Sequence, residues 1–145
     1  MRIIFVCTGN TCRSPMAEGI LKSIYKDYEV LSRGLYVPEE IGASFFSIKA
    51  MQEMDIDISG HKSKQLTVGE AEDCDLVITM TKSHKNIIIS SYPKFSDKTF
   101  TLSEFAGEEG DVRDPYGMDE DTYRECAKQI MRLILKADFE KTERL

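Results

Sequence analysis

Short apolar runs alternate along the chain with longer stretches in which apolar residues recur every three or four positions. The runs are rich in β-branched and aromatic residues, which favours buried strands, whereas the longer spacing favours helices that pack along one face. We expect strands at residues 2–6, 29–32, 76–80 and 98–102, and helices at residues 15–26, 43–54, 67–73, 81–91 and 120–139. This alternation predicts a single three-layer α/β domain over residues 1–145, with helices on both faces of a parallel sheet.

The ends of the expected helices carry capping signals. Asp119 is expected to cap the last helix and Thr67 a short one, where Glu70 completes a capping box. Ser14 is expected to cap the first helix, and Pro15 suits its first turn because the missing N–H is not needed there. The last helix has the clearest amphipathic pattern, and its apolar stripe is expected to comprise Tyr123, Ala127, Ile130, Ile134 and Leu135.

Composition narrows the classes of function. The 145 residues carry a net charge of −6, which argues against nucleic-acid binding because a polyanion needs a basic surface. No apolar run is long enough to span a bilayer, so we expect no membrane association. The four cysteines are expected to be free thiols of a cytoplasmic protein. The chain has two histidines and no cysteine or histidine pairs with zinc-like spacing, so we expect no metal. We also expect no cofactor and a monomer.

The sequence Val-Cys-Thr-Gly-Asn-Thr-Cys-Arg-Ser-Pro, residues 6–15, joins the first strand to the first helix. Such a connection points backbone N–H groups at one spot, where the helix dipole adds partial positive charge. Phosphate fits this spot, and Arg13 offers a planar fork for two of its oxygens. A thiol in this setting ionises readily, so Cys7 is a candidate nucleophile toward phosphorus.

The other loop residues are expected to shape the phosphate site. Gly9 is expected to allow a turn that a Cβ would block, and Asn10 tolerates left-handed backbone geometry. A cysteine and an arginine at this spacing recur by chance, but the complete string from strand to helix is much more specific. The candidate substrate-binding residues in the loop are Thr8, Gly9, Asn10, Thr11, Cys12 and Ser14.

The chain resembles the low-molecular-weight protein tyrosine phosphatase family. The resemblance covers nearly the whole chain and rests on the loop at residues 6–15, on Gly-His-Lys-Ser-Lys-Gln-Leu at residues 60–66, on Asp-Pro-Tyr at residues 114–116 and on the closing helix. It implies a four-stranded parallel sheet in the order 2-1-3-4 and a phosphocysteine intermediate. It also implies that Cys7 is the nucleophile, Arg13 the phosphate ligand and Asp114 the general acid.

The same resemblance implies supporting roles. Ser14 would donate to the thiolate, Asn10 and His61 would hold the loop, and Cys12 would form a reversible disulfide with Cys7 that protects the nucleophile from overoxidation. From the residues alone, Asp114 cannot be separated from the many carboxylates around it, although the following proline stiffens its backbone.

Two positions bear on the phosphorylated residue. The family includes tyrosine phosphatases and a branch that removes phosphate from arginine. Many tyrosine-specific members have an apolar β-branched residue where this chain has Thr11, whose hydroxyl can hydrogen-bond a guanidinium. Gly117 stands where a second aromatic is often found, which leaves Tyr116 as the single aromatic wall, and one ring can still stack on a guanidinium. We expect a phosphorylated protein as substrate, phosphoarginine preferred over phosphotyrosine, and phosphate or sulfate as anions that bind the site.

Two alternatives stay open. An arsenate reductase on the same scaffold would need two further cysteines close together downstream, and Cys74 has no such neighbour. A non-catalytic phosphoprotein-binding module would need neither a thiol nor an acid. Cys74 and Cys126 are expected in the core or on a helix face, and His84 on a partly exposed helix face.

Overall fold

A single parallel sheet organises the chain, of which the computed structural model describes residues 1–140. Its strands are β1 (Arg2–Cys7), β2 (Glu29–Gly34), β3 (Leu76–Thr79) and β4 (Thr99–Thr101), in the spatial order β2-β1-β3-β4. β1 lies in the middle and pairs with β2 on one side and β3 on the other, and Cys7 stands opposite Gly34 in the register. The expected fold class and strand order are therefore confirmed.

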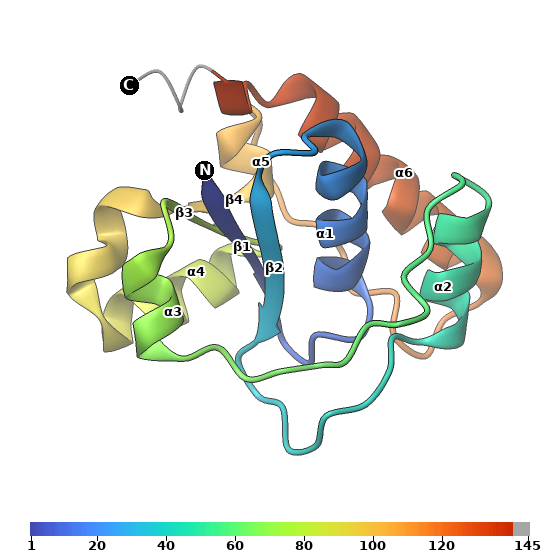
Figure 1. Ribbon diagram of the computed structural model, residues 1–145, viewed down its shortest axis with the longest axis horizontal. Coiled ribbons are helices and arrows are strands. Elements are labelled where there is room, and N and C mark those ends of the chain that lie inside the picture. Colours follow the sequence, from blue (N-terminus) through green and yellow to red (C-terminus); the bar gives the residue numbers. More distant parts are fainter. Residues whose placement is uncertain (141–145) are drawn as a thin grey trace.

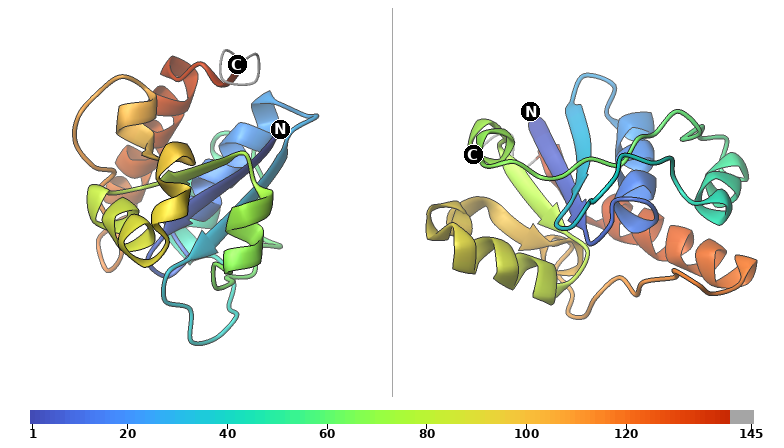
Figure 2. Two further views of the ribbon diagram at one scale, coloured as in Figure 1. Left: turned by 90° about the vertical axis from the view of Figure 1, so that its left-hand side faces the viewer. Right: turned by 90° about the horizontal axis from the view of Figure 1, so that it is seen from below.

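Helices cover both faces of this sheet (Figures 1 and 2). They are α1 (Arg13–Ile24), α2 (Phe45–Gln52), α3 (Val68–Asp73), α4 (Lys82–Ser91), α5 (Leu102–Phe105) and α6 (Glu120–Lys136), with a 3-10 helix η1 (Pro93–Lys98). The sequence pattern predicted five of them and missed η1 and α5, whose four to six residues are too few to show a helical period.

The alternation of side chains along β1 divides the core into two clusters. Ile3 and Phe5 pack on the face covered by α1, α2, α5 and α6. Ile4 and Val6 pack on the opposite face, against α3, α4 and η1. Because both faces are buried, β1 is apolar without interruption from Ile3 to Cys7.

The capping predictions have mixed outcomes. The Asp119 carboxylate accepts from the backbone N–H of Thr122 at 2.9 Å, and Thr67 forms the expected capping box with Glu70. The prediction for Ser14 is wrong, because α1 begins at Arg13 and its N-cap position is Cys12. The Ser14 hydroxyl lies inside the first turn and bonds to other side chains there.

One position in the predicted apolar stripe of α6 is also wrong. Leu135 is 65% exposed, because one residue beyond Ile134 the helix has turned by about 100° away from the core. The residue that completes the buried face is Leu133, three positions after Ile130.

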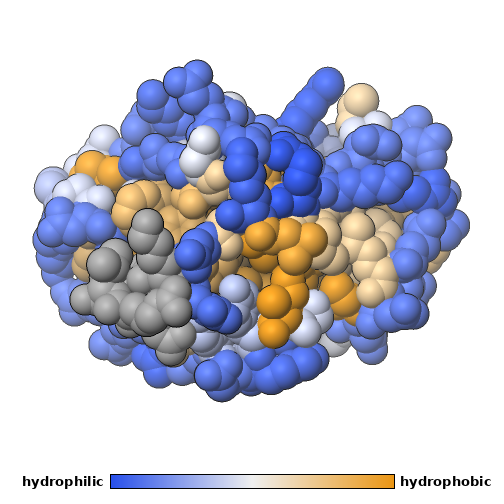
Figure 3. Space-filling view, turned by 90° about the horizontal axis from the view of Figure 1, so that it is seen from above, coloured by the Kyte–Doolittle hydropathy of each residue, from blue (hydrophilic) through white to orange (hydrophobic). Residues whose placement is uncertain are grey.

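The strands run toward one end of the molecule, and the connection from β1 to α1 lies at that end (Figure 1). Figure 3 shows the opposite end, where apolar side chains reach the surface between polar ones. Within the described residues, no helix is both long enough and apolar enough to cross a membrane.

Candidate active site

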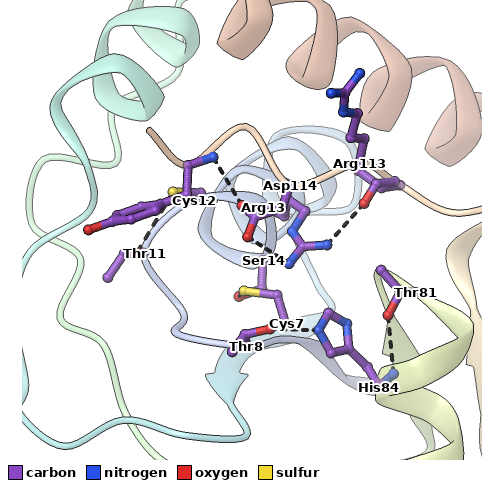
Figure 4. A network of polar contacts seen from close by, with 12 residues as sticks. Cys7, Thr8, Thr11, Cys12, Arg13, Ser14, Thr81, His84, Arg113 and Asp114 are labelled. Carbon is purple, nitrogen blue, oxygen red and sulfur yellow. Dashed lines mark hydrogen bonds and ion pairs between the residues drawn. The ribbon is translucent and has the colours of Figure 1, made fainter. Parts of the chain in front are cut away.

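The carboxyl end of β1 opens into a pocket of about 200 Å³. Cys7 is the last residue of the strand and Arg13 the first of α1, and four of the five residues between them line the pocket: Thr8, Gly9, Thr11 and Cys12. The pocket brings together most of the predicted site residues, from the loop and from a second loop far along the chain (Figure 4). Its lining consists of Cys7, Thr8, Gly9, Thr11, Cys12, Arg13, Asp114 and Tyr116.

The carbonyl groups of this loop are held by surrounding segments. Thr8 and Thr11 accept hydrogen bonds from the backbone N–H groups of Tyr36 and Ser44, at 3.0 and 2.9 Å. The N–H groups of residues 9–12 donate to no acceptor within residues 1–140. Successive free N–H groups beside a helix N-terminus form a cradle of partial positive charge, which suits an anion.

Asn10 is the residue on which the loop turns. Its φ of 58° lies in the left-handed region, and its side chain is fully buried. The amide of Asn10 donates to Ser14 Oγ at 2.8 Å and accepts from the backbone N–H of Lys64 at 3.0 Å. His61 Nε2 donates to the Asn10 carbonyl at 2.7 Å, so His61 contacts the loop from outside the pocket, and neither His61 nor Asn10 lines it.

The expectation for Gly9 is wrong. A Cβ built on Gly9 would meet nothing closer than Thr11 Oγ1 at 3.9 Å, so its place in the loop needs no glycine for space. The steric requirement falls on Gly34 instead, which sequence analysis missed. A Cβ there would lie 2.8 Å from the Thr8 carbonyl oxygen and 3.1 Å from Asn10 Cβ.

The Cys7 sulfur is buried at the base of the pocket. Its Sγ lies 2.9 Å from Ser14 Oγ, which also accepts from the Asn10 amide. Because the Ser14 oxygen accepts the hydrogen bond from Asn10, the Ser14 O–H is free to donate to the sulfur. The Ser14 hydroxyl and the N-terminus of α1 therefore both lie beside the Cys7 sulfur.

The Arg13 guanidinium is held in place but not saturated. It is 4% exposed, donates from Nη1 to the Val112 carbonyl at 3.0 Å, and approaches Asp114 Oδ2 from Nη2 at 3.5 Å. Its Nε is buried and has no hydrogen-bond partner in the described chain. A buried cation with an unused donor is stable only if another anion or polar group can complete its bonding.

Asp114 sits on a turn at the mouth of the pocket. Its Oδ1 accepts from the backbone N–H of Tyr116 at 3.1 Å, and half of its side chain is exposed. Met118 N–H then bonds to the Pro115 carbonyl, which closes a turn with Gly117 at a φ of 78°. A side chain at position 117 would be strained, so Tyr116 is the aromatic residue that this turn presents to the pocket.

Cys12 also lines the pocket, and its sulfur has two hydroxyl neighbours. Its Sγ is 3.4 Å from Ser44 Oγ and 3.6 Å from Tyr123 Oη. Burial, together with the hydrogen bond to Cys12, raises the pKa of Tyr123 to about 12, so the phenol keeps its proton at neutral pH.

His84 is the clearest disagreement with the sequence interpretation. It is buried rather than partly exposed, and its Nε2 lies 2.9 Å from Thr8 Oγ1 (Figure 4). Burial and the charge of Arg13 lower its pKa to about 4, so the ring is neutral at neutral pH. The signal that could have located His84 is its short separation in sequence from the end of β3. It stands in the first turn after a strand that ends at the same sheet edge as Cys7.

The two remaining cysteines lie outside the pocket. Cys74 and Cys126 are buried free thiols. Burial raises the pKa of both, and that of Cys126 to about 12, which makes them poor nucleophiles. Within the described residues, no group of three histidine, cysteine or carboxylate side chains could hold a metal ion.

Comparison with known proteins identifies close relatives. The family model of the low molecular weight phosphotyrosine protein phosphatases matches residues 2–138. A protein-arginine-phosphatase of Bacillus subtilis (strain 168) is 42% identical over 139 residues, which cover 92% of each chain. A solved low molecular weight protein tyrosine phosphatase from T. tengcongensis is 45% identical and superimposes with a TM-score of 0.91 over 100% of this chain and 99% of its own. A solved arginine phosphatase variant with a phosphorylated active-site serine is 39% identical, with a TM-score of 0.90 over 100% of this chain and 95% of its own.

Proposed function

The chain belongs to the low-molecular-weight phosphotyrosine protein phosphatase family and is a protein phosphatase, and from this premise we propose that Cys7 is its nucleophile, Arg13 its phosphate ligand and Asp114 its general acid. The observation that carries the proposal is the buried Arg13 guanidinium. Arg13 and Cys7 line one pocket, and among residues 1–140 neither Arg13 Nε nor the backbone N–H groups of residues 9–12 have a hydrogen-bond partner. Together they supply local positive potential in a chain whose net charge is −6.

The chemistry proceeds in two steps. The Cys7 thiolate attacks phosphorus, a sulfur–phosphorus bond forms, and the bond from phosphorus to the leaving nitrogen or oxygen breaks. Asp114, which lies at the mouth of the pocket, gives its proton to the leaving atom. In the second step a water molecule attacks the phosphocysteine, Asp114 takes a proton from it, and inorganic phosphate and the thiolate are released.

Two residues in the wall of the pocket support a choice of phosphorylated residue. Thr11 lines it, and within residues 1–140 its hydroxyl has one hydrogen-bonding neighbour, Cys12 Sγ at 3.8 Å, so the oxygen can still accept from a guanidinium N–H. Tyr116 is 74% exposed and presents one ring on which a planar guanidinium can stack. The Bacillus relative is named for the same activity. Phosphoarginine in proteins is therefore the proposed substrate, with phosphotyrosine second.

A comparison of two peptides tests the substrate. Matched peptides that carry phosphoarginine or phosphotyrosine are hydrolysed by the wild type, by Thr11→Ile and by Thr11→Ser. Loss of a hydrogen bond to a charged group is worth about 1.5–3 kcal/mol, so Thr11→Ile should lower the ratio of phosphoarginine to phosphotyrosine turnover about tenfold or more. Thr11→Ser keeps the hydroxyl and should keep the ratio. A ratio unchanged in Thr11→Ile contradicts the proposed preference.

Covalent catalysis is tested separately. Cys7→Ser should lose turnover of both peptides, and Cys74→Ser, a thiol-to-hydroxyl change outside the pocket, should retain it. Mass spectrometry of the wild type quenched during turnover should find the phosphoryl group on Cys7. An adduct on another side chain, or full turnover by Cys7→Ser, refutes the assignment of the nucleophile.

The general acid has its own signature in the pH profile. Asp114→Asn cannot protonate the leaving atom, so kcat should fall by about two orders of magnitude and the alkaline limb of the pH profile should flatten. Asp111→Asn changes a carboxylate that is close in sequence but does not line the pocket, and it should keep the wild-type profile. The opposite pattern would move the role of acid to Asp111.

Neither alternative gains support from the site. Arsenate reduction needs a relay of reactive thiols, whereas burial raises the pKa of Cys74 and Cys126. A binding module needs no thiol beneath the anion. We further propose that the enzyme acts as a monomer in the cytoplasm, where its four free thiols are stable, and that Cys7 and Cys12, which line the same pocket, pair reversibly under oxidation.

A further inference from the structure

His84 links α4 to the loop at residues 8–12, which leads to α1 on the opposite face of the sheet. It belongs to the first turn of α4, where the Thr81 side chain caps its backbone N–H at 3.1 Å. Its ring is buried and reaches Thr8 Oγ1 at 2.9 Å, across 76 positions of sequence (Figure 4). Thr8 itself is exposed in the pocket, next to Cys7. The contact therefore links a residue outside the pocket to a hydroxyl inside it.

The direction of this hydrogen bond follows from the surroundings of the ring. Burial and the charge of Arg13 keep the imidazole neutral at neutral pH, so it carries one N–H. Its Nδ1 is buried without a hydrogen-bond partner in the described chain. A proton on Nδ1 would bury an orphaned donor, which folded proteins rarely tolerate, whereas a proton on Nε2 is satisfied by Thr8 Oγ1. Nε2–H is therefore the donor.

Because Thr8 Oγ1 accepts the hydrogen bond from His84 Nε2, the Thr8 O–H is free to donate a hydrogen bond to another group. We propose that His84 is a positioning residue, which by donating to Thr8 Oγ1 turns the Thr8 hydroxyl proton toward the oxygens of the bound phosphoryl group. His84 does not touch the substrate and acts only through Thr8. The inference rests on the proposed function, because it needs a phosphoryl group above Cys7.

The side chains of two variants separate this role from simple packing. His84→Leu fills much of the space of the ring without a donor, and His84→Gln can place an N–H where Nε2 stands. A typical hydrogen bond contributes about 0.5–1.5 kcal/mol, so we expect His84→Leu to lower kcat/KM for p-nitrophenyl phosphate about two- to tenfold, and His84→Gln to recover most of that loss. Ser83→Ala, an exposed neighbour in the same turn, should match the wild type.

The decisive measurement repeats His84→Leu in two backgrounds of position 8. In Thr8→Ser, which keeps the hydroxyl, the substitution should still lower kcat/KM about two- to tenfold. In Thr8→Val, which has no hydroxyl to orient, it should have no further effect. The same fold loss in both backgrounds would show that the ring only packs, and would overturn the inference.

A second measurement needs no variant. Long-range ¹H–¹⁵N spectra of the wild-type ring identify the protonated nitrogen, which should be Nε2, and a proton on Nδ1 would overturn the inference. The outcome is distinct from failure of the proposed function. That failure would appear as p-nitrophenyl phosphate turnover that survives Cys7→Ser, whatever the effect of His84.

Discussion

The buried His84 ring should make the stability of the fold depend on pH. In the unfolded chain its pKa returns to its ordinary value of 6.5, whereas in the folded protein burial, aided by the charge of Arg13, lowers that pKa to about 4. Between these two values the unfolded chain binds a proton that the folded chain does not. The free energy of unfolding therefore rises with pH across this window, and the contribution is lost as pH falls from about 6.5 to about 4.

The size of the effect follows from the width of the window. A difference of about 2.5 units corresponds to about 3 kcal/mol, because each unit is worth about 1.4 kcal/mol. The ring is 6% exposed, so solvent screens this contribution little. Against a total stability of about 5–15 kcal/mol for a domain, a loss of this size is easily measured.

Urea unfolding of the wild type and His84→Gln, followed by circular dichroism from pH 4 to pH 7.5, isolates the contribution. Carboxylates with a lowered pKa, among them Glu70 and Glu104, also weaken both proteins toward acid, and this background cancels in the difference. The wild-type advantage over His84→Gln should shrink by about 3 kcal/mol between pH 7 and pH 4. Two curves that stay parallel over this range would refute the reasoning.

Three further substitutions test the loop and its supports. Gly34→Ala puts a Cβ 2.8 Å from the Thr8 carbonyl oxygen, so it should destabilise the protein by about 1–3 kcal/mol and reduce turnover. Gly60→Ala, whose Cβ would have nothing within 4 Å, should do neither. Equal melting temperatures and activities of the two variants would contradict the packing argument. Asn10→Ala should cost about 2–3 kcal/mol in urea unfolding, since it strains a φ of 58° and leaves the Lys64 N–H unpaired, and a cost below 0.5 kcal/mol would count against its role. Asp119→Ala removes the cap of α6, so thermal melts should show a loss of about 1 kcal/mol with unchanged kcat; a fall in kcat would mean that α6 is coupled to the chemistry.

The features that the sequence predicted depend on local signals. An apolar run, a loop with Cys and Arg and a helix with Pro15 in its first turn are recognisable within fifteen residues, so the position of the pocket at the end of β1 could be anticipated. The caps Thr67 and Asp119 were likewise predictable, because a capping box or an N-cap involves residues only three positions apart.

The features that were missed depend on partners far along the chain. Gly34 needs to be glycine because the β1–β2 register places it opposite Cys7, and that register is not visible in either strand alone. The face that α4 turns inward depends on the sheet it packs against, so His84 was expected to be partly exposed. Ser14 is a different case, because its local position suggested a cap and only the family resemblance implied the contact with Cys7 that the fold makes.

The pocket takes its parts from both ends of the chain, from Cys7 in β1 to Tyr116 in the turn before α6. Synthesis on a ribosome delivers these parts in order, and Val112, whose carbonyl accepts from Arg13, is added after all four strands. A nascent chain that lacks the segment after β4 therefore has a sulfur and a guanidinium but no closed pocket around them. Protein phosphatase activity therefore requires synthesis of the chain through Tyr116.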